Sequence, residues 1–143
     1  RRVLFRSLTK LLSKNFSYVV GTDINYQVLT NQTYKTTNLI CCNSSDALHA
    51  KFDLIICNLP YLSTDEILDI ATDGGPEGLE IPLKIIKSAI LCLNSTGKFL
   101  FVTSSLSNYQ ALIDASKKEG LKTRIISKKK LFFEELILVE AKK

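Results

Sequence analysis

The sequence predicts an α/β fold, in which a mainly parallel sheet carries helices on both faces. Two observations carry this prediction. Strand-like and helix-like segments alternate through roughly the first hundred residues, and the strand-like segments are continuously apolar, which indicates strands covered on both faces. Because ligands of such sheets bind at the carboxyl ends of the strands, the residues that follow each strand are the candidate site residues.

The first half of the chain predicts short elements. Leucines at helical spacing predict a helix over residues 8–15, and a β-branched run predicts a strand over residues 18–24. A polar, helix-like piece follows from residue 25 to about residue 34. Two further apolar runs, 38–42 and 52–57, predict the next two strands.

The second half predicts longer elements. An apolar stripe predicts a helix over residues 82–93 that stops near Asn94 and Gly97. Between the last two strands, Lys128–Lys130 predict a solvated turn. The other elements are a strand over 98–103, a helix over 108–119 ended by Gly120, and strands over 122–127 and 135–141. The residues that follow strands, and so merit inspection, are Asp23, Asn43 with Ser44, Asn58 to Tyr61, and Thr103 to Ser105.

Composition narrows the class of protein. The 143 residues, 45% hydrophobic and 23% charged, fit a single soluble domain that buries a core. No apolar run approaches the ~20 residues of a membrane span, and no signal peptide is visible, so we expect a cytoplasmic protein without a membrane partner. His49 is expected on the surface. The cysteines form no C-x-x-C pair, which suggests neither a metal site nor a disulfide framework, and we expect four reduced core residues: Cys41, Cys42, Cys57 and Cys92.

The net charge of +5 is concentrated at the start of the chain. Three of the four arginines lie within "RRVLFRS", which resembles the translation of a sequencing adapter, so we expect residues 1–7 to be foreign and residues 8–143 to form the domain. Removing those three from the 19 basic residues leaves 16 against 14 acidic ones. The charge argument for a nucleic-acid partner therefore mostly disappears. The absence of Met fits a chain whose true start is missing.

The most specific signal is Asn58-Leu59-Pro60-Tyr61, at the end of an apolar strand. The side-chain oxygen of Asn58 and the next backbone carbonyl are two acceptors that suit a planar NH₂ group in a cleft. Pro60 lacks an N–H and stiffens the turn, and Tyr61 offers a flat wall for stacking. This pattern points to alkylation of a weakly nucleophilic nitrogen by positioning and electrostatics, without a tuned general base. The plainer alternative is an ordinary turn, because an Asn before a proline-containing tripeptide often starts one.

Three segments, taken together, carry a family resemblance. They are "VVGTDIN", "FDLIICNLPY" and "DGGPEGLEIPLKII". With the [DN]-x-P-[YFW] motif of S-adenosylmethionine-dependent nitrogen methyltransferases, the chain resembles the HemK/PrmC family of protein-glutamine N5-methyltransferases, nearest to its short archaeal and eukaryotic branch. The resemblance covers residues 8–143. It implies a Rossmann-like class I methyltransferase fold with an antiparallel last strand.

The resemblance also assigns roles to residues. An acid after the second strand binds the cofactor's ribose, and a residue after the third lies near the adenine amine. The implied catalytic residues are Asn58, Leu59, Pro60 and Tyr61. The implied residues for S-adenosylmethionine are Asp23, Ile24, Asn43, Ser44, Asp46 and Asn58. Simpler interpretations stay open, because Asp23 suits a helix N-cap and the glycines of "DGGPEG" suit a loop with positive φ.

The chain departs from the family pattern in three places. Leu59 replaces a proline, a position that works through its backbone carbonyl. Asn43, with Asp46 three residues on, stands where the family has an acid. The first strand and its E-x-G-x-G loop are absent, so we expect a fragment that binds S-adenosylmethionine poorly, and we expect methyl transfer of the intact protein.

Several functions remain in contention. The first is methyl transfer to the glutamine of the Gly-Gly-Gln motif of a translation release factor, with a small zinc-binding activator subunit over an apolar sheet edge. The second is methylation of an amino group in ribosomal RNA or DNA, since "NLPY" is the spelling in the ribosomal-RNA adenine dimethyltransferases. The weak residual charge disfavours it, and so does "DGGPEG" at residues 73–78, hereafter the glycine segment. The third is a non-catalytic remnant of either enzyme.

Overall fold

The structure is a computed structural model that describes residues 3–31, 38–66, 69 and 72–143. By its contacts the chain divides into two compact units, residues 1–48 and residues 49–143, and each is described by itself. The expectation of a single domain over residues 8–143 stays a prediction, as does the foreign origin of residues 1–7. No helix among the described residues is long and apolar enough to cross a membrane.

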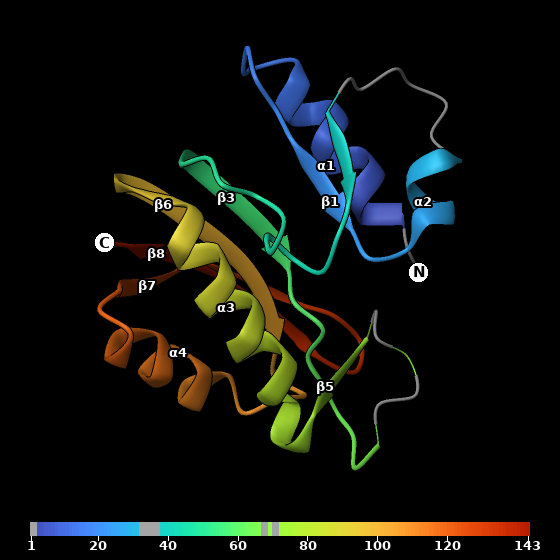
Figure 1. Ribbon diagram of the computed structural model, residues 1–143. Coiled ribbons are helices and arrows are strands. Elements are labelled where there is room, and N and C mark those ends of the chain that lie inside the picture. Colours follow the sequence, from blue (N-terminus) through green and yellow to red (C-terminus); the bar gives the residue numbers. More distant parts are fainter. Residues whose placement is uncertain (1–2, 32–37, 67–68, 70–71) are drawn as a thin grey trace. The chain divides into compact units, whose positions relative to one another are not determined.

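In the described residues of unit 1 there are two helices and two short strands (Figure 1). Asn25 begins the second helix by accepting hydrogen bonds from the backbone N–H groups of Gln27 and Val28. This helix ends at Thr30, and the expected continuation to residue 34 lies outside the described residues. The elements are α1 (Val3–Ser13), β1 (Gly21–Asp23), α2 (Tyr26–Thr30) and β2 (Leu39–Cys41).

The strands of unit 1 form a parallel pair in which Gly21 lies opposite Leu39 and Asp23 opposite Cys41. The strand expected over residues 18–24 is shorter, Gly21–Asp23, and just before it the side-chain amide of Asn38 donates to the carbonyl of Val19 at 3.1 Å. Cys41 is exposed, so its expected place in the core is wrong.

Unit 2 is built on a four-stranded sheet in the order β3-β6-β8-β7. Strands β3 and β6 are parallel, whereas β8 runs antiparallel to both of its neighbours. The α/β class and the antiparallel last strand are therefore confirmed. The elements are β3 (Phe52–Asn58), β4 (Leu62–Ser63), β5 (Asp73–Gly75), the 3₁₀ turn η1 (Pro76–Gly78), α3 (Glu80–Cys92), β6 (Leu93–Ser104), α4 (Tyr109–Lys118), β7 (Lys122–Lys130) and β8 (Glu135–Lys142).

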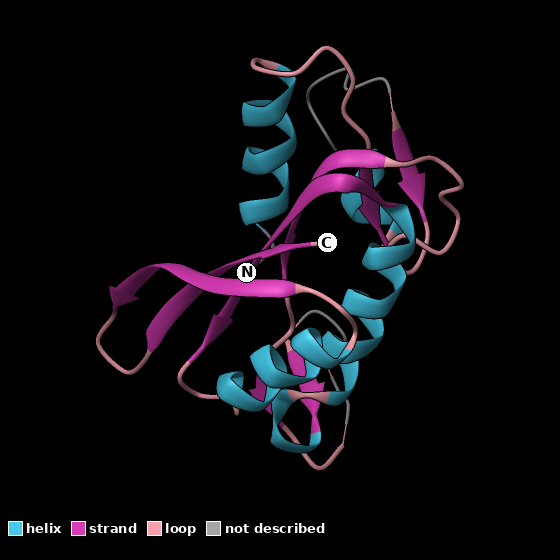
Figure 2. Cartoon of the chain, turned by 90° about the vertical axis from the view of Figure 1, so that its left-hand side faces the viewer, coloured by secondary structure: helices cyan, strands magenta, loops and turns pink. Residues whose placement is uncertain are grey.

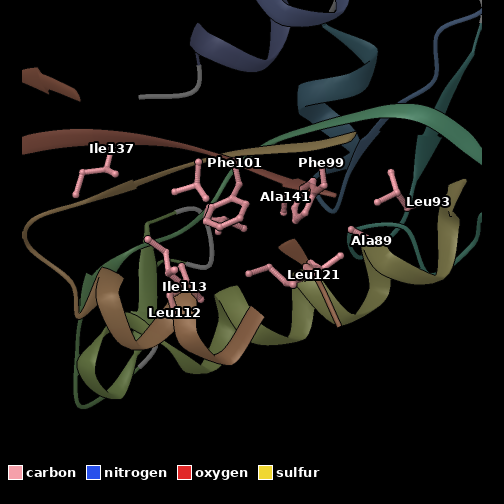
Figure 3. Packing of buried hydrophobic residues seen from close by; sticks show 12 residues of the cluster. Ala89, Leu93, Phe99, Phe101, Leu112, Ile113, Leu121, Ile137 and Ala141 are labelled. Carbon is pink, nitrogen blue, oxygen red and sulfur yellow. The ribbon is translucent and has the colours of Figure 1, made fainter. Parts of the chain in front are cut away.

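Helices α3 and α4 cover one face of this sheet (Figures 1 and 2). Alternate residues of β6 point into the core, where the rings of Phe99 and Phe101 lie 5.3 Å apart between centroids (Figure 3). Both rings are fully buried, and each such burial contributes about 2–3 kcal/mol. The helices supply Ile86, Ala89, Leu112 and Ile113 to the same cluster.

Two expectations for unit 2 need correction, and one pair of strands was not expected. Lys128–Lys130 are not a turn, because they extend β7 and pair with residues 135–137 of β8. They are exposed, as expected. Strand β6 begins at Leu93, well before residue 98, directly after α3. The short parallel pair β4–β5 was not expected at all.

Candidate active site

The Asn58–Tyr61 segment leaves the sheet at the carboxyl end of β3. Asn58 lies opposite Val102 of β6, and the backbone N–H of Leu59 donates to the carbonyl of Val102 at 3.2 Å. Leu59 is only 1% exposed and Pro60 is buried, while Asn58 and Tyr61 are half-buried. The apolar Leu59 side chain thus anchors the turn in the core, which is compatible with a role for its backbone alone.

The glycine segment packs directly against this turn. A Cβ added at Gly74 would lie 2.8 Å from the carbonyl oxygen of Pro60, and one added at Gly78 would lie 2.3 Å from that of Tyr61. Gly78 also has a φ of 67°, a conformation that favours glycine. The glycines are therefore required for close approach of one backbone to another as well as for turning.

Two further contacts hold the glycine segment in place. The backbone N–H of Thr64 donates to the carbonyl of Gly75 at 3.2 Å, within the β4–β5 pairing. The backbone N–H of Asn108, at the start of α4, donates to the carbonyl of Glu77 at 3.2 Å. The turn after β3 is consequently fixed from β4 and, through the glycine segment, from α4.

Two acceptors of the turn are left open. Among the residues that the structure describes, neither the side-chain amide of Asn58 nor the carbonyl of Leu59 has a hydrogen-bond partner. The polar atoms of the Asn58 side chain are also not fully buried, so solvent or a ligand can reach them. Both groups are therefore free to bind a polar ligand.

Tyr61 lies beside the carboxylate of Glu134, a residue that no local sequence pattern placed at this site. Burial and, next, the charge and hydrogen bond of Glu134 raise the pKa of the Tyr61 hydroxyl above its usual value. Ser104, at the end of β6, donates from its hydroxyl to the same carboxylate. Thr103 to Ser105 were flagged because they follow a strand, but no local signal marks Glu134, which belongs to the β7–β8 turn.

Cys57 is the nearest thiol along the chain to the Asn58 motif. Burial raises the pKa of its thiol to about 12, so the thiol is protonated at neutral pH. Since the thiolate is the reactive form, Cys57 is a structural residue. This agrees with chemistry that needs positioning groups rather than a nucleophile.

The candidate cofactor residues, apart from Asn58, gather at the carboxyl ends of β1 and β2 in unit 1. Asp23 and Cys41 are opposite one another, so Asp23 and Ile24 share an edge with the segment that contains Asn43, Ser44 and Asp46. Ser44 has a φ of 51°, and the backbone N–H of Asp46 donates to the carbonyl of Asn43 at 3.1 Å. The structure thus brings the five unit 1 residues to one edge of the pair.

Asp23 does not cap α2, because Asn25 occupies that position. One carboxylate oxygen of Asp23, Oδ1, accepts a hydrogen bond from the backbone N–H of Asn25 at 2.7 Å. Its other oxygen, Oδ2, has no hydrogen-bond partner among the described residues. A carboxylate fixed by one oxygen and open at the other fits a ribose diol, and the exposed Ile24 beside it offers an apolar contact.

Comparisons with known proteins agree on the class. No protein-family model matches the chain. The Mtq2 protein of E. cuniculi, solved with Trm112 as the complex responsible for methylation of the eRF1 translation termination factor, superposes with a TM-score of 0.80 at 21% identity, over 95% of this chain and 77% of that one. The ribosomal protein L11 methylase of Lactobacillus delbrueckii gives a TM-score of 0.61 at 19% identity, over 96% of this chain and 66% of that one. The fold is that of the class I S-adenosylmethionine-dependent methyltransferases.

A closer relative defines the family. A protein of Methanocaldococcus jannaschii, provisionally named protein N5-glutamine methyltransferase MJ0928, is 35% identical over 140 residues, which span 90% of this chain and 71% of the relative. The chain belongs to this relative's family of S-adenosylmethionine-dependent methyltransferases.

Proposed function

We propose that this protein transfers a methyl group from S-adenosylmethionine to the side-chain amide nitrogen of a protein glutamine. The proposed substrate is the Gly-Gly-Gln motif of a translation release factor. The observation that carries the proposal is a pair of acceptors without hydrogen-bond partners among the described residues, the side-chain oxygen of Asn58 and the carbonyl of Leu59. The glycine segment packs against the turn that contains them. The names of the 35% identical relative and of the Mtq2 complex support the substrate class.

Each residue of the turn has a separate part in positioning the substrate amide. Oδ1 of Asn58 and the carbonyl oxygen of Leu59 accept hydrogen bonds from the two N–H groups of the substrate amide and fix its plane. Pro60 contributes no competing donor, and the ring of Tyr61 forms a wall against the amide. When bound, S-adenosylmethionine supplies an electrophilic methyl group on a sulfonium sulfur. The chain's contribution is orientation and electrostatics rather than proton removal.

The cofactor residues are proposed on the geometry of unit 1. Asp23 binds the ribose hydroxyls through its open oxygen, and Ile24 contacts the adenosine. Asn43 and Ser44, with Asp46 close by, bind the adenine side of the cofactor, and Asn58 contributes from the catalytic turn.

A small partner subunit is also proposed. Among the described residues, β2 pairs on one side only, with β1, which leaves the other edge available for strand addition. The Mtq2 protein was solved with Trm112, which supports a partner of that kind here, and a zinc-binding activator is the expected type. Co-purification with a Trm112-type protein, and its loss when residues of β2 are replaced by proline, would test this.

The decisive experiment is Asn58→Ala, assayed by incorporation of labelled methyl groups into recombinant eRF1. Loss of an orienting acceptor should lower the rate by at least about 10²-fold, because both substrate hydrogens need fixed partners. Asn94→Ala is the matched control. This half-buried amide, which bonds to Asp53 at the other end of the sheet, should leave the rate unchanged when it is removed.

The same assay separates the protein substrate from a nucleic-acid one. Ribosomal RNA is offered beside eRF1 under identical conditions. Methylation of the RNA alone would make the nucleic-acid amino group the substrate, and unchanged turnover in Asn58→Ala would remove the turn from the mechanism.

A further inference from the structure

We propose that the tip of the β7–β8 hairpin, Leu131–Phe133, docks an apolar segment of the protein substrate beside the acceptor glutamine. This inference rests on the proposed function, and it adds the surface that selects the substrate. The tip consists of Leu131, Phe132 and Phe133.

The tip exposes large apolar side chains. Phe132 is 92% exposed and Phe133 85%, and Leu131 is 38% exposed. The two rings meet edge to face, with centroids 4.6 Å apart and an interplanar angle of 85°. Exposed aromatic pairs of this kind contribute little to a protein's own folding and are typical of recognition surfaces.

The tip is held in a defined position. The backbone N–H of Leu131 donates to the carbonyl of Glu134 at 2.7 Å and closes the turn. Ser105 and Glu135 are joined twice, since the N–H of Ser105 donates to the carbonyl of Glu135 and the N–H of Glu135 donates to the hydroxyl of Ser105, each at 2.9 Å. A presented surface that is already ordered loses little entropy on binding.

The tip is continuous with the candidate active site. Glu134 follows Phe133 directly; its carboxylate accepts a hydrogen bond from the hydroxyl of Ser104 and lies close enough to Tyr61 for its charge to add to burial in raising the pKa of the Tyr61 hydroxyl. A polypeptide whose glutamine lies against Tyr61 therefore has its neighbouring residues within reach of the tip.

The charges around the tip indicate which segment it docks. Lys129 and Lys130 are exposed and form no ion pair with any residue in the described part of the chain, whereas Lys128 is paired with Glu135 at 3.1 Å. An apolar tip with two available cations on one flank complements an apolar segment that carries acidic residues.

The tip is less suited to RNA. Single-stranded nucleic acid binds aromatic side chains through successive stacked bases, which needs ring faces open on a common side. The perpendicular rings of Phe132 and Phe133 do not provide that arrangement, and Leu131 has no ring.

The test is the double variant Phe132→Ala/Phe133→Ala of the full chain, with binding of recombinant eRF1 measured by biolayer interferometry. Removal of two aromatic contacts should raise Kd about tenfold or more. Leu91→Ala is the matched control, because Leu91 is also exposed (71%) but lies near the end of α3, just before β6 begins. Its Kd should not change.

A second variant, Lys129→Ala/Lys130→Ala, tests the charge argument. It should slow association a few-fold at low salt and lose that effect at high salt. Equal eRF1 binding by the wild type and the Phe132→Ala/Phe133→Ala variant would overturn this inference and leave the proposed function intact. Loss of ribosomal-RNA binding without loss of eRF1 binding would overturn it too. A wild type that neither binds nor methylates eRF1 would overturn the proposed function itself.

Discussion

At the scale of single residues, the candidate site depends on groups that the fold brings together from distant parts of the chain. Tyr61 follows β3, Ser104 ends β6, and Glu134 directly precedes β8. The Ser104 hydroxyl donates to the Glu134 carboxylate, and burial and, next, the charge of that carboxylate raise the pKa of the Tyr61 hydroxyl. Glu134 thereby fixes the wall against which the substrate amide is proposed to lie.

Replacing Glu134 with Gln should lower the pKa of the Tyr61 hydroxyl toward its ordinary value. The carboxylate raises that pKa by its charge and as a hydrogen-bond partner, while burial, the largest cause, persists in the variant. The shift should therefore be partial. Ultraviolet titration of the tyrosinate band in the wild type and in Glu134→Gln, with Tyr61→Phe subtracted to isolate Tyr61, measures it. An unchanged titration would mean that Glu134 does not contact Tyr61 in solution.

At the scale of elements, the glycine segment explains why the turn after β3 is rigid. It is a backbone that lies against another backbone, and only residues without a Cβ allow this approach. Gly78 is the tightest point, since an added Cβ would meet the Tyr61 carbonyl oxygen at 2.3 Å and the Ser107 Cβ at 2.8 Å.

Gly78→Ala should consequently lower the free energy of unfolding by about 3 kcal/mol or more, because strain from positive φ adds to overlap with the backbone. Gly120→Ala is the matched control. Gly120 has a φ of 89° but would meet nothing within 4 Å, so its variant should lose only about 1–2 kcal/mol. Urea denaturation of the two variants compares them directly. Equal losses would show that the close approach to Tyr61 contributes nothing.

The elements that local signals define were predictable, and those that depend on distant contacts were not. Helix α4 was expected to end before Gly120 because glycine tolerates positive φ, and Asn108 caps its other end as such residues commonly do. Strand β3 was visible as a short apolar run. In contrast, β4 has two residues and is defined only by its pairing with β5, which no local pattern encodes.

The candidate site divides in the same way. The Asn58–Tyr61 motif and Asp23 could be found because Asn58 and Asp23 each stand at the carboxyl end of an apolar strand. Glu134 could not be found, because it reaches Tyr61 only through the hairpin. Lys128–Lys130 were misplaced for a related reason: a lysine run predicts solvation correctly, but it does not distinguish an exposed edge strand from a turn.

At the scale of the whole molecule, a single carboxylate joins three strands of the sheet in unit 2. Glu140 on β8 is 8% exposed at its side chain and lies 2.7 Å from Nε of Arg124 on β7, 3.3 Å from Nζ of Lys142 and 4.0 Å from Nζ of Lys98 on β6. The pairing of β8 with both neighbours therefore carries an electrostatic contribution in addition to its backbone hydrogen bonds.

This arrangement predicts how the stability of the protein decreases as the pH falls into the acid range. The hydrogen bond from Arg124 and, to a lesser extent, that from Lys142 together with the charges of both lower the pKa of Glu140, although burial opposes them. A carboxyl whose pKa is lower in the folded than in the unfolded state stabilises the fold above its unfolded pKa, and this stabilisation is lost as the pH falls through the folded value. Glu140→Gln should therefore lower the melting temperature at neutral pH and flatten its decline in acid. Thermal denaturation followed by circular dichroism from neutral to acidic pH measures both effects. If the wild type and Glu140→Gln lose stability in parallel as the pH falls, then Glu140 has the same pKa in the folded and the unfolded chain.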